Sequence, residues 1–211
     1  MERYAVVYSE KLEEYEIGNV LGRDRYRNFM ELFKKYFGSR TDFKIIEASY
    51  AAFEDLKLVH TEQYIRRIEN YDSRDPWDTP LSPAFVRAAK LLAGAGKAAG
   101  ELVQSESFVK AFVVGGGVQH ANRQQEKGFG VFSDIGICAE NLMTNFGVKK
   151  ILIIDTDAHA GEGIHEIFYE DPRVLCISIH QDPSTLYPGK GFIHETGKGQ
   201  IGRASCRERV C

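Results

Sequence analysis

Five stretches of the chain are apolar at nearly every position instead of at alternating ones. They are residues 4–8, 43–47, 111–114, 151–154 and 174–179. Strands that are apolar on both faces are typical of a parallel sheet whose two faces are covered by helices. The pattern therefore predicts five buried, parallel strands.

The segments between these strands predict helices. The Ser-Pro pair at positions 82–83 suits an N-cap followed by the first helical residue, and the predicted helix runs to about Gln104. Asp134 is predicted to cap a second helix over residues 135–146, with Gly147 as its C-terminal stop.

The alternation of strands and helices predicts one α/β domain of three layers (αβα) around a central, mainly parallel sheet. Residues 70–82 are rich in Asp and Pro, which predicts a loop and not a domain boundary. We therefore expect the strands and helices to share one core.

Composition and charge narrow the class of protein. The chain is 43% hydrophobic and 27% charged, with a net charge of −3, as in folded globular proteins. This charge attracts neither nucleic acid nor an anionic membrane surface. No apolar run approaches the roughly 20 residues that span a bilayer. We expect a cytoplasmic protein with no nucleic-acid and no membrane partner, and the sequence does not indicate its oligomeric state.

The segment after the fourth strand carries the clearest candidate chemistry. Asp155, Asp157 and His159 follow one another at two-residue spacing directly after residues 151–154. Along an extended chain such residues project to the same side, so their side chains can converge on a divalent metal. Mixed oxygen and nitrogen ligands suit Zn2+, with Fe2+ or Mn2+ as alternatives. The competing interpretation is a surface Asp/His turn that caps the next helix.

A second group of polar residues follows the third strand. Three glycines at positions 115–117 precede Gln119 and His120. The spacing is not that of a dinucleotide-binding loop, and the glycines are better explained by close approach of the backbone at the end of a strand. From its position alone, His120 would be a metal ligand, a general base or a structural histidine.

Five motifs in this order resemble the histone deacetylase-like zinc hydrolases of the arginase/deacetylase superfamily, including bacterial acetoin-utilisation and acetylpolyamine amidohydrolase relatives. The resemblance extends from Asp78 to about residue 199. The motifs are GGGVQHA (115–121), GFGVFSD (128–134), DTDAHAGEG (155–163), VLCISIH (174–180) and YPGKG (187–191).

The resemblance implies hydrolysis of an acyl amide such as acetyl-lysine or an acetylpolyamine. Asp157 and His159 match two of the three protein ligands of the catalytic zinc. His120 matches the second histidine of the family's His-His pair, the general base. Glu162 occupies the place of the acidic or amide residue that orients this histidine, and Gln119 that of the first histidine of the pair.

The resemblance also implies a structural K+ or Na+ site and a narrow substrate tunnel. Asp155 and Ser178, with the backbone carbonyls of Asp157, His159 and Ile179, match the cation site. Gly128, Phe129 and Tyr187 match the tunnel walls, and Asp78 matches a carboxylate at the rim that binds the substrate backbone. The alternative is that Phe129 and Tyr187 are core aromatics and Ser178 is an ordinary strand residue.

Three positions depart from the family pattern. Gln119 replaces a histidine and cannot hold a proton as imidazole does. Ala160 replaces another histidine, and Glu162 is longer than the usual aspartate by one methylene. An arginase-like ureohydrolase would carry a further carboxylate at the position of Gly161. These departures leave a non-catalytic binding or regulatory pseudoenzyme and, less well supported, a ureohydrolase as alternatives.

The C-terminal part of the family pattern is not found in this chain. The third zinc ligand and the tyrosine that stabilises the oxyanion would both follow residue 200. Residues 201–211 resemble the translation of a sequencing-adapter oligonucleotide, so we expect them to be non-native. Residues 1–200 are then the N-terminal part of a deacetylase-like domain whose α/β fold is incomplete, and this fragment is expected to be inactive.

Overall fold

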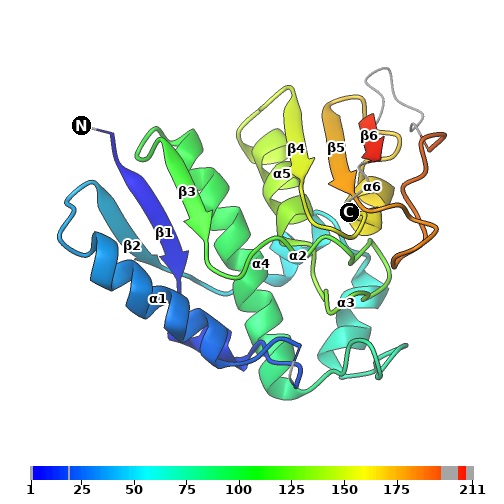
Figure 1. Cartoon of the computed structure of the whole chain (residues 1–211), viewed down its shortest axis with the longest axis horizontal. Helices are drawn as coiled ribbons and strands as arrows, with labels where there is room; N and C mark the ends of the chain where they lie inside the picture. Colours follow the sequence, from blue (N-terminus) through cyan, green and yellow to red (C-terminus); the bar gives the residue numbers. More distant parts are fainter. Residues whose placement is uncertain (1, 19, 196–203, 208–211) are drawn as a thin grey trace.

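The computed structural model describes residues 2–18, 20–195 and the backbone of 204–207. Helices and strands alternate along most of this chain (Figure 1). The described residues contain six strands: β1 (Tyr4–Tyr8), β2 (Phe43–Glu47), β3 (Lys110–Val113), β4 (Ile151–Asp155), β5 (Val174–His180) and β6 (Ala204–Arg207). The helices are η1 (Glu10–Glu14, 3₁₀), α1 (Asp24–Phe37), α2 (Phe53–Lys57), α3 (Glu62–Glu69), α4 (Pro83–Gln104), α5 (Asp134–Asn145) and α6 (Glu162–Ile167).

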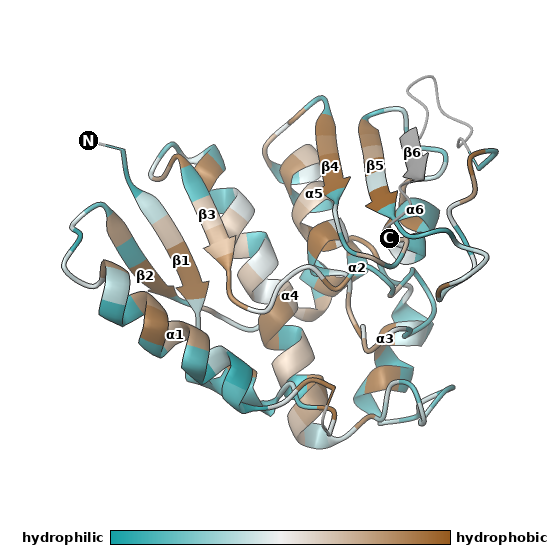
Figure 2. Cartoon of the chain, viewed as in Figure 1, coloured by the Kyte–Doolittle hydropathy of each residue, from teal (hydrophilic) through white to brown (hydrophobic). Residues whose placement is uncertain are grey.

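All of the strand pairs are parallel, and they form two groups of three strands. The first group has the order β2-β1-β3 and the second β4-β5-β6. Helices flank the strands (Figure 1), so the predicted α/β fold with a parallel sheet and covering helices is confirmed. Strands β1 to β5 are largely apolar (Figure 2), but the predicted burial holds mainly for β1 and β5, because β2, β3 and β4 each keep exposed positions.

Two helices cover opposite faces of the first group of strands. On one face, the Phe29 ring of α1 lies 5.4 Å from the Phe112 ring of β3, and Phe33 lies 5.5 Å from Phe43 of β2. On the other face, α4 packs against β1 and β3. Strand β1 is consequently buried on both sides, with Val7 fully inaccessible.

Helix α4 has the bounds that the sequence predicts. The Ser82 hydroxyl accepts a hydrogen bond from the Phe85 amide at 3.1 Å, and Pro83 occupies the first turn. Glycines allow α4 to approach α5 closely, since a Cβ at Gly100 would lie 2.7 Å from the Cys138 sulfur. The resulting α4–α5 contact joins the two groups of strands from behind (Figure 1).

The predicted cap of α5 is wrong. Ser133 is the N-cap, and its hydroxyl accepts from the Gly136 amide at 3.2 Å, while Asp134 is the first helical residue. The Asp134 carboxylate instead accepts from the Gly117 and Val118 amides at 2.8 and 3.0 Å. A buried carboxylate needs such donors, and these two fix the glycine loop that leads to the candidate site.

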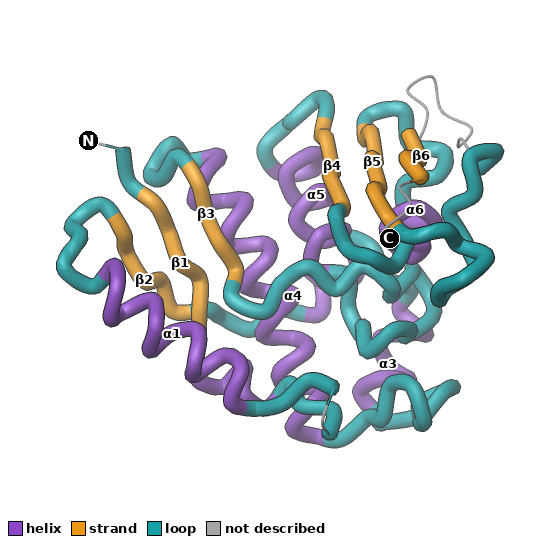
Figure 3. The backbone as a smooth tube through the Cα atoms, in the orientation of Figure 1, coloured by secondary structure: helices purple, strands orange, loops and turns teal. Residues whose placement is uncertain are grey.

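No strand pairing joins β3 and β4 within the described residues, and a gap separates the two strands in Figure 3. A cavity of about 440 Å³ lies between them above α4 and α5. Phe112, Leu152 and Ile154 around it are each more than half exposed. An uncovered apolar strand edge of this kind readily accepts a further strand.

Residues 204–207, within the segment expected to be non-native, form β6 beside β5, whereas 201–203 and 208–211 lie outside the described residues. Among the described helices, none combines the length and the apolar character needed to cross a membrane.

Candidate active site

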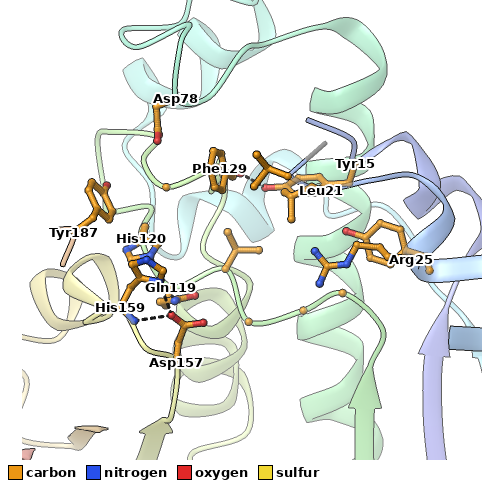
Figure 4. A pocket seen from close by; sticks show the side chains of 17 residues that line it. Tyr15, Leu21, Arg25, Asp78, Gln119, His120, Phe129, Asp157, His159 and Tyr187 are labelled. Atoms are coloured by element: carbon orange, nitrogen blue, oxygen red, sulfur yellow. Dashed lines mark hydrogen bonds and ion pairs between the residues drawn. The ribbon is translucent and has the colours of Figure 1, made fainter. Parts of the chain in front are cut away.

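The candidate site lies where the loops after β3, β4 and β5 meet at the carboxyl ends of the strands (Figure 3). In α/β folds with parallel strands this edge is the usual position of a site. A cavity of about 510 Å³ opens there (Figure 4). Eight of the predicted residues line it: Asp78, Gln119, His120, Gly128, Phe129, Asp157, His159 and Tyr187.

His120 and Glu162 form a buried pair at one side of the cavity. The His120 Nδ1 atom lies 2.6 Å from Glu162 Oε2, and the residues are only 6% and 4% exposed. Because a carboxylate accepts, Nδ1 carries the proton and Nε2 is left as the basic nitrogen. Glu162 therefore fixes both the tautomer and the orientation of His120.

The backbone around this pair is built for close contact. The Ile164 amide donates to the Gln119 carbonyl at 3.1 Å, which attaches α6 to the loop after β3. A Cβ at Gly163 would lie 2.4 Å from the His120 carbonyl oxygen, so only glycine permits this contact. The first turn of α6 thus delivers Glu162 directly to His120.

Gln119 occupies the place where the family resemblance implies a second histidine. Its Nε2 atom lies 3.5 Å from His120 Nε2, at the long limit of a hydrogen bond. An amide at this position is a donor near the basic nitrogen but does not exchange a proton. It therefore cannot replace an imidazole in acid-base chemistry.

Asp157 and His159 lie beside His120, on the same side of the cavity (Figure 4). Asp157 Oδ1 accepts from the His159 amide at 2.7 Å and lies 2.9 Å from His159 Nδ1. Their side chains are 49% and 42% exposed, and the His159 ring is 6.0 Å from that of His120. The predicted ligand pair therefore lies next to the predicted base.

A carboxylate and an imidazole are donors that zinc accepts, so these two residues fit part of a zinc site. Within residues 2–18 and 20–195, no three His, Cys, Asp or Glu side chains gather as a potential metal site. The described part of the chain thus offers Asp157 and His159 as two ligands.

Asp155 lies beneath this pair at the end of β4. Its Oδ1 atom accepts from the Asp157 amide at 3.0 Å, whereas Oδ2 is buried without a hydrogen-bond partner. Burial, with the nearby Asp157 charge, raises the pKa of Asp155. An orphaned, buried carboxylate oxygen fits a cation, which would compensate for its loss of hydration.

The other predicted members of the cation site are placed unequally. Ser178 pairs with Asp155 in the β4–β5 register and is fully buried, and its hydroxyl lies 2.8 Å from His180 Nδ1. Ile179 is the next residue of β5 and is partly exposed. Asp155 and Ser178 therefore lie together, while the hydrogen bond with the His180 ring explains the Ser178 hydroxyl equally well.

Gly128 and Phe129 form one wall of the cavity. Gly128 has a φ of +51°, and a Cβ there would lie 2.4 Å from His120 Cδ2. The Phe129 carbonyl accepts from the Tyr15 hydroxyl at 2.5 Å, which holds the aromatic ring at the cavity (Figure 4). Glycine is thus required for this wall to rest against the imidazole.

Tyr187 forms the opposite wall and is not a core aromatic. Its ring lies 5.3 Å from that of His120, and its hydroxyl donates to Glu162 Oε1 at 3.5 Å. It is 47% exposed. Burial of the hydroxyl and the charges of Glu162 and Asp78 raise the pKa of Tyr187, so the phenol remains protonated and can donate.

Asp78 lies at the outer rim of the cavity (Figure 4) and accepts from the Thr79 hydroxyl at 2.8 Å. The far end of the cavity was not predicted. Tyr15, Leu21, Arg25 and Tyr26 line it together with the glycine loop. The signal was the glycine run itself, since a Cβ at Gly115 would lie 2.3 Å from the Tyr26 ring.

Comparisons with known proteins show which family and which fold the chain shares. The sequence profile of the histone deacetylase domain family matches residues 20–207. A probable deacetylase of Methanothermobacter thermautotrophicus is 36% identical over 160 residues, which cover 74% of this chain and 48% of that protein. The acetoin utilization protein AcuC of Bacillus subtilis is 33% identical over 172 residues, covering 75% and 44%.

The fold is also shared with a solved structure, that of the HDA15 HD domain. The TM-score is 0.87 at 25% identity, and the match covers 98% of this chain and 62% of that one. The chain spans about half the length of the curated relatives that it matches. The predicted resemblance is confirmed: the chain belongs to the histone deacetylase domain family.

Proposed function

We propose that the protein removes an acyl group, such as acetyl, from an acylated amine by metal-dependent hydrolysis of the amide. The observation that carries this proposal is the buried His120–Glu162 pair, whose histidine lines one cavity beside Asp157 and His159. Metal-assisted hydrolysis of an acyl amide needs a metal that activates water and a positioned base within reach of that water. The family relationship supports the same class of reaction.

Asp157 and His159 would hold the metal, preferably zinc, with the remaining ligands supplied from outside the described residues. When bound, zinc would polarise the acyl carbonyl and activate water near neutral pH. Asp155, whose Oδ2 atom has no hydrogen-bond partner, would hold K+ or Na+ with Ser178. That charge would support the backbone of the ligand loop from below.

His120 would take the proton of the attacking water on Nε2 and later give it to the leaving amine. Glu162 would hold Nδ1 and stabilise the imidazolium that forms, as a carboxylate does for a catalytic histidine. Gln119 would orient a polar group by hydrogen bonding and move no proton. Gly128, Phe129 and Tyr187 would enclose the acylated chain, and Asp78 would bind the substrate at the rim.

A second candidate is a pseudoenzyme that binds acylated amines without turnover. It is favoured by one observation: the amide of Gln119 stands 3.5 Å from His120 Nε2, at the place of an imidazole. The two functions differ in whether the bound amide is cleaved. An arginase-like ureohydrolase has no comparable support, because Gly161 stands where a further carboxylate would be needed.

The proposal is tested with two proteins: this chain, and an extended protein in which residues 201–211 are replaced by the natural continuation at the source locus. We expect the extended protein to bind one equivalent of zinc and to release acetate from an acetyl-lysine reporter. This chain should keep well under one equivalent of zinc after dialysis and show no turnover, because two protein ligands hold zinc weakly.

Metal analysis by mass spectrometry and an acetate assay measure both properties. Tight binding of the reporter by the zinc-loaded extended protein without release of acetate would favour the pseudoenzyme. Turnover by this chain itself would overturn the proposal that its ligand set is incomplete.

A further inference from the structure

Trp77, the only tryptophan of the chain, is 96% exposed. It directly precedes Asp78, which lines the cavity, so its Cα is about 3.8 Å from that of a rim residue. An exposed indole forfeits the favourable burial of a large apolar surface. The exposure of Trp77 must therefore be explained by the structure of the loop or by what the loop binds.

The loop holds Trp77 outward through hydrogen bonds on both sides of it. The Thr79 amide donates to the Asp75 carbonyl at 2.8 Å, and the Asp78 amide donates to Asp75 Oδ1 at 3.2 Å. Upstream, the Arg74 amide donates to Glu126 Oε1 at 2.7 Å, and Thr79 is fully buried. These anchors fix the backbone of the loop beside the rim residue Asp78, and they leave the indole exposed to solvent.

The mouth of the cavity is negatively charged. Asp75 and Asp78 lie near enough to Tyr187 for their charges to add to that of Glu162 in raising the pKa of its hydroxyl. Among the residues that line the described cavity, the one Lys or Arg is Arg25, at the far end (Figure 4). Arg74 lines a different surface hollow with Asn122 and Arg123. A positive group outside the cavity would therefore meet uncompensated carboxylates.

We propose that Trp77 determines substrate specificity: its indole packs against the part of the substrate that stays outside the cavity, and with Asp75 it selects substrates that carry a positive charge there. An indole face binds ammonium groups better than any other side-chain ring, and the carboxylates attract the same charge. This inference rests on the proposed function, since it assumes that an acylated amine enters the cavity.

The test compares two ligands with the same acyl group and chain length. N-acetylputrescine carries an ammonium at its far end, and N-butylacetamide is its neutral counterpart. In the extended protein we expect the cationic ligand to bind about 3- to 30-fold more tightly, the range that a cation–π contact supplies. Calorimetry measures the affinities, and a saturable change of Trp77 fluorescence shows that the ligand reaches the indole.

Variants separate the indole from the charge. Trp77→Ala should raise KM for N-acetylputrescine to near that of N-butylacetamide without changing kcat, and Trp77→Phe should fall between the two proteins. Asp75→Asn keeps an oxygen that accepts from the Asp78 amide but removes the charge. It should therefore reduce the preference for N-acetylputrescine over N-butylacetamide at least twofold. Tyr36→Ala, an exposed aromatic on α1, and Asp72→Asn in the same loop are the matched controls and should change neither value.

The outcomes distinguish this inference from the proposed function. Equal kcat/KM for the two ligands, unchanged in Trp77→Ala, would overturn the role of Trp77 and leave the hydrolase intact. A preference for the cation without any hydrolysis would support Trp77 and contradict the proposed reaction. Protection of Trp77 from acrylamide quenching in the free protein would show that another surface covers the indole, and it would also overturn the inference.

Discussion

The two halves of the candidate site differ in how completely the chain builds them. His120 and Glu162 are nearly inaccessible and lie 2.6 Å apart, with α6 tied to the histidine loop by a backbone hydrogen bond. Asp157 and His159 are almost half exposed and hydrogen-bond to each other. The first pair is a finished pair, already assembled by its own hydrogen bond, whereas the second offers two candidate metal ligands with no third His, Cys, Asp or Glu gathered beside them among the described residues.

The difference has a physical origin. All four residues come from residues 115–163, but the first pair needs only one hydrogen bond between the loop after β3 and the first turn of α6. A metal site needs three or four converging donors, and mutual repulsion of such donors is relieved only when the metal is bound. A preformed base beside an open ligand pair is therefore the arrangement that a metal would complete.

The largest effect should follow from removing a ligand. We expect Asp157→Ala in the extended protein to lose both zinc and all measurable hydrolysis, because it removes one of the two candidate ligands that the described residues offer. Metal analysis and the acetyl-lysine reporter measure the two losses. Asp72→Ala, which removes an exposed carboxylate from the 70–82 loop, is the control and should behave as the parent does. Near-stoichiometric zinc in Asp157→Ala would show that another residue is the ligand.

A smaller and more selective effect is expected at the finished pair. His120→Ala should reduce kcat about 10²- to 10⁴-fold, the usual contribution of a positioned acid-base group, while zinc content stays unchanged. His194→Ala, an exposed histidine whose ring stacks on Phe192, serves as the control for loss of an imidazole. If His120→Ala kept near-full activity, the base would have to be sought elsewhere. If it lost zinc, His120 would be a ligand and the two halves of the site would not be separate.

Much of the fold was predictable because its signals are local. The apolar runs at 4–8 and 43–47 have the observed bounds of β1 and β2, and the Ser-Pro pair marks the start of α4. The predicted strand at 111–114 begins one residue earlier, and β4 and β5 each extend one residue further. These shifts are the fraying expected at element ends.

Other features depend on contacts between distant residues, which no local pattern contains. Helix α1 is dense in charged and aromatic residues, and it is stabilised by aromatic packing on β2 and β3. The division of the strands into two groups depends on which strands pair with one another, and the sequence pattern of a single strand does not show this. Asp134 suits a helix cap by its position, but its carboxylate instead accepts hydrogen bonds from the amides of Gly117 and Val118.

The family resemblance of the motifs predicted more of the candidate site than residue chemistry and spacing did. Spacing alone suggests that Asp155, Asp157 and His159 converge, but it leaves the role of His120 open. The resemblance adds Glu162 and Tyr187, and the structure places both beside His120. The roles of these residues stay predictions until the variants are measured. The far end of the cavity, with Arg25, was missed because its residues carry no spacing signal.

The smallest effect is expected from Gly128, which forms the cavity wall against the His120 ring. Gly128 and Gly147 both have positive φ, +51° and +69°, so alanine costs about 1–2 kcal/mol of backbone strain at either. A Cβ at Gly147 meets nothing within 4 Å, whereas at Gly128 it would lie 2.4 Å from the His120 ring.

Gly128→Ala should therefore lower the free energy of unfolding by about 1–3 kcal/mol more than Gly147→Ala does, the usual effect of overpacking. In a protein of this size that difference lowers Tm by a further several degrees, at about 2–4 °C per kcal/mol. Thermal unfolding of the two variants of the extended protein measures it, with kcat as a second readout. Gly128→Ala should also reduce kcat, because the methyl group displaces the imidazole from Glu162, while Gly147→Ala should not. Equal losses of Tm and unchanged kcat in both variants would mean that the wall yields and that His120 is held by Glu162 alone.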